Sequence, residues 1–119
     1  MPRGRALVAV GAELQQQLVE VLRGWAVHVV ADGAAAIDYL WDASADLVIL
    51  DFDLPRQSAY DVVRHLSMRR PELLGRTIAV FDGAPEVHAL VQSVPIGSRL
   101  EKPVDAGNLR SEIERVAGI

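Results

Sequence analysis

The stretch Asp46-Leu47-Val48-Ile49-Leu50-Asp51-Phe52-Asp53-Leu54-Pro55 decides the fold. Its continuous apolar run has the length of a strand and is non-polar in both side-chain directions, which is typical of a strand buried on both faces. Asp51 stands where this predicted strand ends. Because ligands and chemistry are found at the carboxyl ends of the strands in an open parallel sheet, Asp51 is a candidate functional residue. The alternative is that Asp51 only marks the edge of the apolar run, solvated or bonded to a loop amide.

Four further short strands are expected along the rest of the chain, each a short apolar run: Arg5 to Val10, Ala26 to Val30, Arg76 to Phe81 and, more weakly, Ser98 to Leu100. Five helical patterns lie between and after these strands. The first runs from Leu14 to Trp25 with Gly24 as the stop, the second is capped by Asp32 and runs to about Asp42, and the third begins with Ser58 and Asp61 and stops before Pro71. A short fourth helix starts at Pro85, and the last is capped by Asp105. Five strands that alternate with five helices predict one α/β domain over residues 1–119, a parallel sheet with helices on both faces.

The composition excludes several kinds of protein. The chain of 119 residues has no cysteine, so disulfides and thiolate sites are excluded. Its net charge of -4 argues against direct binding of nucleic acid. No apolar run is long enough to span a bilayer and the start lacks a signal peptide, so no membrane contact and a cytoplasmic location are expected.

Four chemistry-bearing positions follow successive predicted strands: Gly11, Asp51, Asp82 and Lys102. They are expected to converge on one crevice, because the carboxyl ends of parallel strands share one edge of the sheet. The three histidines have no metal-ligand spacing and are expected to be ordinary surface or half-buried residues. Since the chain also has no nucleophile elbow and no glycine-rich phosphate loop, no enzymatic activity is expected.

The pattern resembles the receiver domain of bacterial two-component response regulators over essentially the whole chain. The resemblance rests on the stretch around Asp51, on the Asp32-Gly33 opening of the second helix, and on Leu100-Glu101-Lys102-Pro103-Val104-Asp105. It implies a flavodoxin-like (CheY-like), doubly wound sheet with strand order 2-1-3-4-5. It also implies that Asp51 occupies the phospho-acceptor position and Lys102 the position of the family's invariant lysine.

The chain departs from that family at the metal site. Receiver domains hold Mg²⁺ with an acidic pair just after the first strand, the acceptor aspartate and a backbone carbonyl, and here the positions of the pair are Gly11 and Ala12. Because Mg²⁺ is held mainly by carboxylates and water, losing both acids removes most of its ligands. The sequence therefore predicts no cofactor and argues against Mg²⁺ binding and phosphorylation of Asp51.

Three further departures concern the switch. Asp82 stands where the family has a threonine or serine, and a carboxylate would repel a phosphoryl group instead of donating to it. Arg99 replaces the usual tyrosine or phenylalanine, and a guanidinium resists burial unless it is paired. Val94-Pro95-Ile96 stands where many members have a Gly-Ala step, which predicts a remodelled surface between the fourth helix and the fifth strand.

These departures lead to a hypothesis of a locked pocket, in which Lys102 forms salt bridges with Asp51 and Asp82, with Asp53 as a possible third acid. Two alternatives remain open. The carboxylates could bind a divalent cation through a different ligand set, and Asp82 could cap the helix that follows it.

The sequence thus predicts an atypical receiver domain that acts by phosphorylation-independent protein-protein interaction. The expected partner is a histidine kinase, an output domain or a second copy, and the expected partner face contains Val91, Val94, Ile96 and Arg99. One alternative is a phosphorylatable receiver, with Asp51 served by a non-standard metal site that recruits Glu13 or Asp53. A flavodoxin-like cofactor binder is a third reading, disfavoured because Glu13 stands where a phosphate loop is needed.

Overall fold

A computed structural model describes residues 3–54, 58–82 and 84–118 of the chain. The elements follow in the order β1 (Arg5–Ala9), α1 (Ala12–Val21), β2 (Ala26–Val30), α2 (Gly33–Asp42), β3 (Leu47–Asp51), α3 (Ser58–Arg69), a short 3₁₀ helix (Pro71–Arg76), β4 (Thr77–Phe81), α4 (Pro85–Gln92), β5 (Ser98–Glu101) and α5 (Ala106–Ala117). Strands and helices alternate throughout, as the apolar runs and caps predict.

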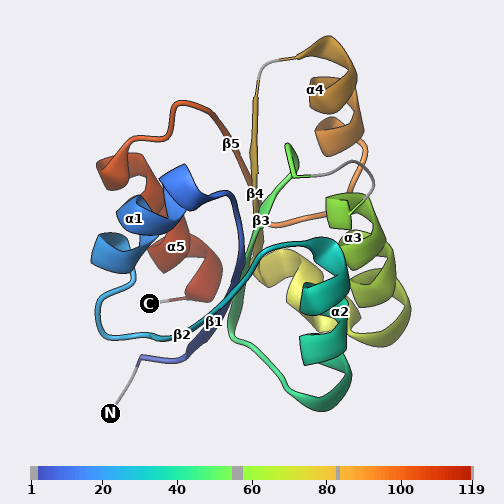
Figure 1. Ribbon diagram of the computed structural model, residues 1–119, viewed down its shortest axis with the longest axis horizontal. Coiled ribbons are helices and arrows are strands. Elements are labelled where there is room, and N and C mark those ends of the chain that lie inside the picture. Colours follow the sequence, from blue (N-terminus) through green and yellow to red (C-terminus); the bar gives the residue numbers. More distant parts are fainter. Residues whose placement is uncertain (1–2, 55–57, 83, 119) are drawn as a thin grey trace.

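The five strands form one parallel sheet with the order β2-β1-β3-β4-β5. Helices α1 and α5 cover one face of the sheet, and α2, α3 and α4 cover the other (Figure 1). The predicted fold class and strand order are therefore confirmed. Within the described part of the chain, no helix is long and apolar enough to cross a membrane.

The hydrophobic core consists of two layers, one on each side of the sheet. All five residues of β3 are buried, and they alternate between the layers: Val48 and Leu50 face α2 and α3, while Leu47 and Ile49 face α1 and α5. Both side-chain directions of β3 are non-polar because this strand lies in the middle of the sheet with helices on both sides. This arrangement fixes Asp51, its last residue, at the carboxyl edge of the sheet.

Several predicted helix signals are confirmed. The Asp32 carboxylate accepts a hydrogen bond from the N–H of Ala35, and Asp105 accepts two, from Gly107 and Asn108. Pro85 lies in the first turn of α4. The predictions for Pro55 and for the Ser58 side chain lie outside the residues whose structure is described.

Several element boundaries differ from the predictions, and β5, for example, extends one residue further, to Glu101. α1 ends at Val21, and Gly24 adopts a positive φ of 95° in the turn beyond it, so Leu22 and Trp25 are buried without belonging to the helix. β4 begins at Thr77, because Arg76 still belongs to the 3₁₀ helix that Pro71 begins. β1 ends one residue early, at Ala9. Apolar runs mark burial, and burial extends past the ends of the regular elements.

Candidate functional site

The carboxyl ends of β1, β3, β4 and β5 meet at an open cleft of about 650 Å³. Its lining residues come from the loops and helix ends at this edge of the sheet: Gly11, Ala12, Glu13, Leu14, Gln17, Asp51, Asp82, Lys102, Pro103 and Val104. All four positions that were predicted to converge, Gly11, Asp51, Asp82 and Lys102, lie here. The parallel arrangement of the strands is what brings these distant segments together.

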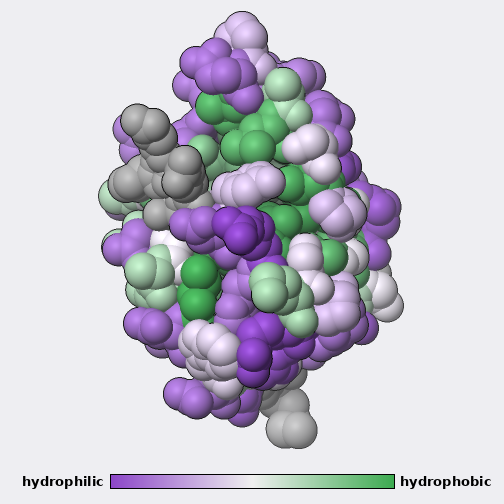
Figure 2. Space-filling model, turned by 90° about the vertical axis from the view of Figure 1, so that its right-hand side faces the viewer, coloured by the Kyte–Doolittle hydropathy of each residue, from purple (hydrophilic) through white to green (hydrophobic). Residues whose placement is uncertain are grey.

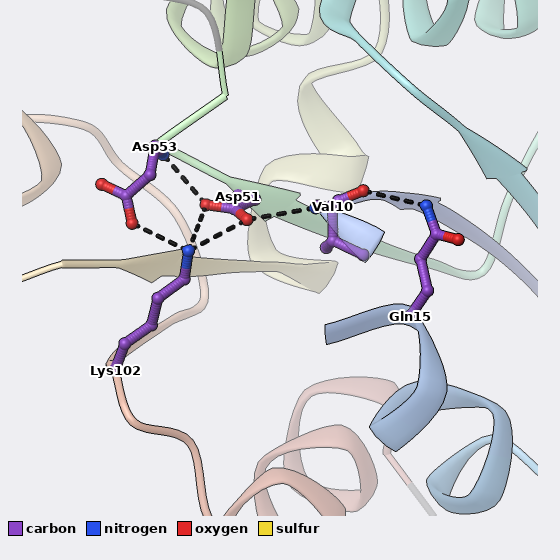
Figure 3. A network of polar contacts seen from close by, with 6 residues as sticks. Val10, Gln15, Asp51, Asp53 and Lys102 are labelled. Atoms are coloured by element: carbon purple, nitrogen blue, oxygen red, sulfur yellow. Dashed lines mark hydrogen bonds and ion pairs between the residues drawn. The ribbon is translucent and has the colours of Figure 1, made fainter. Parts of the chain in front are cut away.

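The Asp51 carboxylate lies at the bottom of the cleft and is only 3% exposed. Oδ1 accepts hydrogen bonds from the Asp53 N–H at 2.9 Å and from Lys102 Nζ at 3.0 Å. Oδ2 accepts from the Gly11 N–H at 3.3 Å and from Lys102 Nζ at 3.1 Å. Figure 3 shows Lys102 and Asp53 beside the carboxylate. Two donors on each oxygen approach the capacity of a carboxylate, which has about four lone-pair sites.

Lys102 supplies the positive charge of this network. It directly follows β5, where its backbone N–H donates to the Phe81 carbonyl at 2.7 Å, and the peptide bond to Pro103 is cis. Its ammonium group lies 2.9 Å from Asp53 Oδ2 as well as contacting Asp51. Burial opposes the charge, but the hydrogen bonds and charges of Asp53 and Asp51 outweigh it and raise the pKa of Lys102 above its ordinary value of 10.5. The lysine is therefore held in its charged form between two carboxylates.

The predicted salt bridge between Lys102 and Asp51 is confirmed, and Asp53 supplies a second carboxylate. The sequence named Asp53 only as a possible member. The Asp53 carboxylate reaches Lys102 because the Asp53 N–H donates to Asp51, and this hydrogen bond turns the chain after β3 toward the cleft. Asp82 lines the same cleft, and its predicted salt bridge with Lys102 stays a prediction. The alternative that Asp82 is the N-cap of the next helix is wrong, since the N-cap residue of α4 is Ala84.

The residues of the cleft do not match a receiver-type magnesium site. Gly11 and Ala12 have no carboxylates, and the Gly11 N–H occupies an oxygen of Asp51 instead. Across the described ranges, no group of three or more His, Cys, Asp or Glu side chains is arranged to hold a metal ion. Gln15 ties the start of α1 to the end of β1, because its side-chain amide donates to the Val10 carbonyl at 3.1 Å (Figure 3). The groups in direct contact with the Asp51 carboxylate are therefore hydrogen-bond donors.

Arg99 lies on β5 and is paired, as a partly buried guanidinium must be. Its Nε donates to the Val91 carbonyl at 3.0 Å and its Nη2 donates to the Val94 carbonyl. These carbonyls belong to the last turn of α4 and the segment after it, and carbonyls at the end of a helix have no partner within the helix. Arg99 thus fastens β5 to the end of α4, at the position where the resemblance implies a mobile aromatic ring.

The expected partner face is wrong for three of its four residues. Val91, Val94 and Ile96 are buried in the core layer beneath α2, α3 and α4, so their side chains are not available to a partner. The resemblance placed these residues on that face, whereas the end of α4 and the segment after it fold inward onto the sheet. Leu90 and Pro95 are exposed apolar residues beside them. Figure 2 shows apolar atoms gathered on the upper part of this side, where α4 lies.

The histidines are ordinary, as predicted. His28 stacks on Tyr39 with ring centroids 4.3 Å apart, His65 meets the edge of Trp41 and His88 packs beside Phe81. Burial, together with Arg69 and Arg70, lowers the pKa of His65. Each histidine therefore serves packing and stays away from the cleft.

No protein-family model and no curated protein matches the sequence. Among solved structures, the chain is similar to the signal receiver domain of a putative Luxo repressor protein from Vibrio parahaemolyticus (TM-score 0.80, 22% identity, covering 98% of this chain and 91% of that one). It is similar to the receiver domain of a sensor histidine kinase from Pseudomonas aeruginosa, solved with a magnesium ion coordinated in the active site cleft (TM-score 0.81, 23% identity, 98% of both chains). A third is the signal receiver domain of a signal transduction histidine kinase from Syntrophus aciditrophicus (TM-score 0.84, 22% identity, 97% and 90%). At these identities the likeness shows the fold: the chain has the fold of a signal receiver domain.

Proposed function

We propose that this chain is a receiver domain of two-component signalling that passes on its signal by protein-protein recognition, without phosphorylation of Asp51. The receiver fold supports the first part of the proposal. The observation that carries the second part is the saturation of the Asp51 carboxylate. Both of its oxygens are occupied by N–H donors, and one of these is the ammonium group of Lys102.

The chemistry of phosphoryl transfer supports this reading. An attacking carboxylate needs a free lone pair, and the charge on the phosphoryl oxygens has to be neutralised, which in this reaction class is done largely by a metal ion. At this site, Gly11 and Ala12 provide no ligands for a metal, and Lys102 is already shared by two carboxylates. The cleft therefore favours one fixed state over a switch.

A protein partner is part of the proposal, and the side formed by α4 and β5 is where we place its contact. There the exposed residues Leu90 and Pro95 would meet the partner, in place of the buried valines. Arg99 supports this choice, because it holds the end of α4 against β5 and so gives the surface a fixed shape. A kinase, an output domain and a second copy of the chain are all compatible with such a surface.

A second candidate function is favoured by one observation: Glu13 and Asp82 line the same cleft as Asp51. In this candidate, a cation held by a non-standard ligand set would allow Asp51 to accept a phosphoryl group. It requires Lys102 to leave at least one oxygen of Asp51.

Incubation with acetyl phosphate and Mg²⁺, followed by mass spectrometry of the intact protein, separates the two candidates. We expect no phosphoryl adduct on the wild type, and Asp51→Asn serves as the blank. The matched control is the double variant Gly11→Asp and Ala12→Asp, which restores the acidic pair. A Cβ atom at residue 11 would lie 3.7 Å from Asp51 Oδ2, an ordinary contact, so the backbone accepts the change.

The double variant should gain Mg²⁺ binding, seen as saturable amide NMR shifts around Asp51, because carboxylates are the ligands that Mg²⁺ requires. A phosphoryl adduct on the wild type that disappears in Asp51→Asn would contradict the proposed function and establish the second candidate.

A further inference from the structure

The outer edge of β2 is an unpaired strand edge. β2 is the first strand of the sheet (Figure 1). Four of its five residues are exposed. The Ala26 N–H donates to the Gly4 carbonyl, on the side of β1. Because backbone groups alternate in direction along a strand, the N–H and C=O groups of Val27 and Val29 point outward, away from the sheet. Four backbone groups therefore face away from every described strand.

The edge has none of the features that usually prevent strands from pairing. Natural proteins protect exposed edges with charged residues, proline, bulges or a covering helix. β2 reads Ala-Val-His-Val-Val, without a charged residue or proline, and it is regularly paired with β1 along its whole length. Val27 and Val29 are 40% and 44% exposed. The strand is therefore apolar as well as unpaired.

One exposed apolar side chain of α1, that of Val19, lies on the flank toward this edge. One flank of α1 faces α5. It carries Gln17, which lines a cavity together with Val104, and Glu20, which lines another together with Arg110. Val19 lies on the other flank, at 100° per residue around the helix, and is 66% exposed. α5 packs on β3, β4 and β5, so the flank with Val19 is the one toward β2. Val27 and Val29 point to this same face of the sheet, since they pair with Ala6 and Val8 of the layer beneath α1 and α5.

We propose that a second copy of this chain docks on this edge, β2 against β2, in an antiparallel pair with its two-fold axis at His28. In this register Val27 lies opposite Val29 of the other copy, and the four outward groups of each strand find partners in the other. His28 then faces its own counterpart as a non-hydrogen-bonded pair. The occupant is a second copy because the strand is complementary to itself in this register.

The charges at the ends of β2 also fit this register. Arg23 precedes the strand and Asp32 follows it, and both are exposed. Because the two strands run in opposite directions, the start of each β2 lies at the end of the other, so Arg23 of one copy is at the same end of the pair as Asp32 of the other, twice per dimer. Within its own chain Arg23 pairs with Glu20, and Asp32 accepts from the Ala35 N–H. Opposite charges therefore stand at both ends of an uncharged strand pair, and such complementarity favours an antiparallel second copy. The contact is separate from the Asp51 cleft, so it does not depend on the proposed function.

The absence of cysteine allows a direct test of the register. Residues in a non-hydrogen-bonded antiparallel pair have Cα atoms about 4.5 Å apart, which falls within the range that a disulfide spans. His28→Cys should therefore form a disulfide-linked dimer under mild oxidation. Val27→Cys should not, because residue 27 faces residue 29 of the other copy. Met68→Cys, at a residue 80% exposed on α3, measures the rate of random collision.

A non-covalent measurement completes the test. Sedimentation equilibrium of the wild type up to about 1 mM should show a reversible dimer, weak because a pair of five-residue strands buries less than the roughly 1,200 Å² of a stable interface. Val29→Lys should weaken it at least about tenfold, since a charge on the edge opposes pairing. Met68→Lys is the matched control and should leave the dimer unchanged.

Three results would overturn the proposal. The first is a wild type that stays monomeric at every concentration, and in that case the partner of the β2 edge would be a strand of another protein. The second is a dimer that Val29→Lys does not weaken, and the third is cross-linking of His28→Cys no faster than that of Met68→Cys.

Discussion

Replacing Lys102 by methionine tests the central element of the cleft. Methionine keeps most of the length of the side chain but removes the charge, so the carboxylate of Asp51 stays buried with only the N–H groups of Gly11 and Asp53 as donors. Breaking a buried ion pair by removing one partner costs about 3–5 kcal/mol. The lysine side chain is 32% exposed and the cleft is open, so water can replace part of its contribution. We therefore expect a loss of about 2 kcal/mol in the free energy of unfolding.

This loss is large enough to measure by thermal and urea unfolding at neutral pH. For a chain of this size the entropy of unfolding is about 0.25 kcal/mol/K, so 2 kcal/mol corresponds to a decrease of about 8 °C in Tm. Combining Lys102→Met with Asp51→Asn should restore about 1 kcal/mol or more, because the uncompensated buried charge is then gone. If Lys102→Met unfolds within about 2 °C of the wild type, or if the double variant is no more stable than Lys102→Met, the ion pair does not hold the cleft as described.

Two further predictions concern the same region. Lys102 is the only lysine in the chain, so ¹³C-lysine labelling gives one side-chain NMR signal, which should titrate above pH 10.5 in the folded protein. Because the folded pKa is raised, the stability difference between wild type and Lys102→Met should be constant at neutral pH and shrink as the pH rises through that folded pKa. A titration midpoint at or below 10.5 would contradict this. Arg99→Leu should cost about 1 kcal/mol and speed amide exchange in the last turn of α4, since the Val91 and Val94 carbonyls lose their donor. Arg23→Leu, measured at a concentration low enough to keep the chain monomeric, removes an exposed pair with Glu20 and should cost less than about 0.5 kcal/mol. Equal losses in the two variants would refute the role of Arg99.

The sequence determined the fold and the place of the site. Leu47 to Leu50 is apolar at every position over the length of a strand, which is the pattern of a strand covered on both faces. Once the strands are parallel, their carboxyl ends share one edge, which is why Gly11, Asp51, Asp82 and Lys102 could be predicted to meet. The absence of carboxylates at Gly11 and Ala12 is likewise a matter of side-chain chemistry and needs no coordinates.

Only the tertiary structure decided which groups contact one another and which face outward. Asp53 and Asp82 are both acids close to Lys102, and the bond of the Asp53 N–H to Asp51 turns the chain so that the Asp53 carboxylate reaches the ammonium group. The resemblance placed Val91, Val94 and Ile96 on a partner face, yet they are buried because the segment folds onto the sheet. Conversely, Val27 and Val29 read as core residues and are exposed, because β2 lies at the edge. A sequence records the polarity of each side chain, whereas burial also depends on what the rest of the chain places beside it.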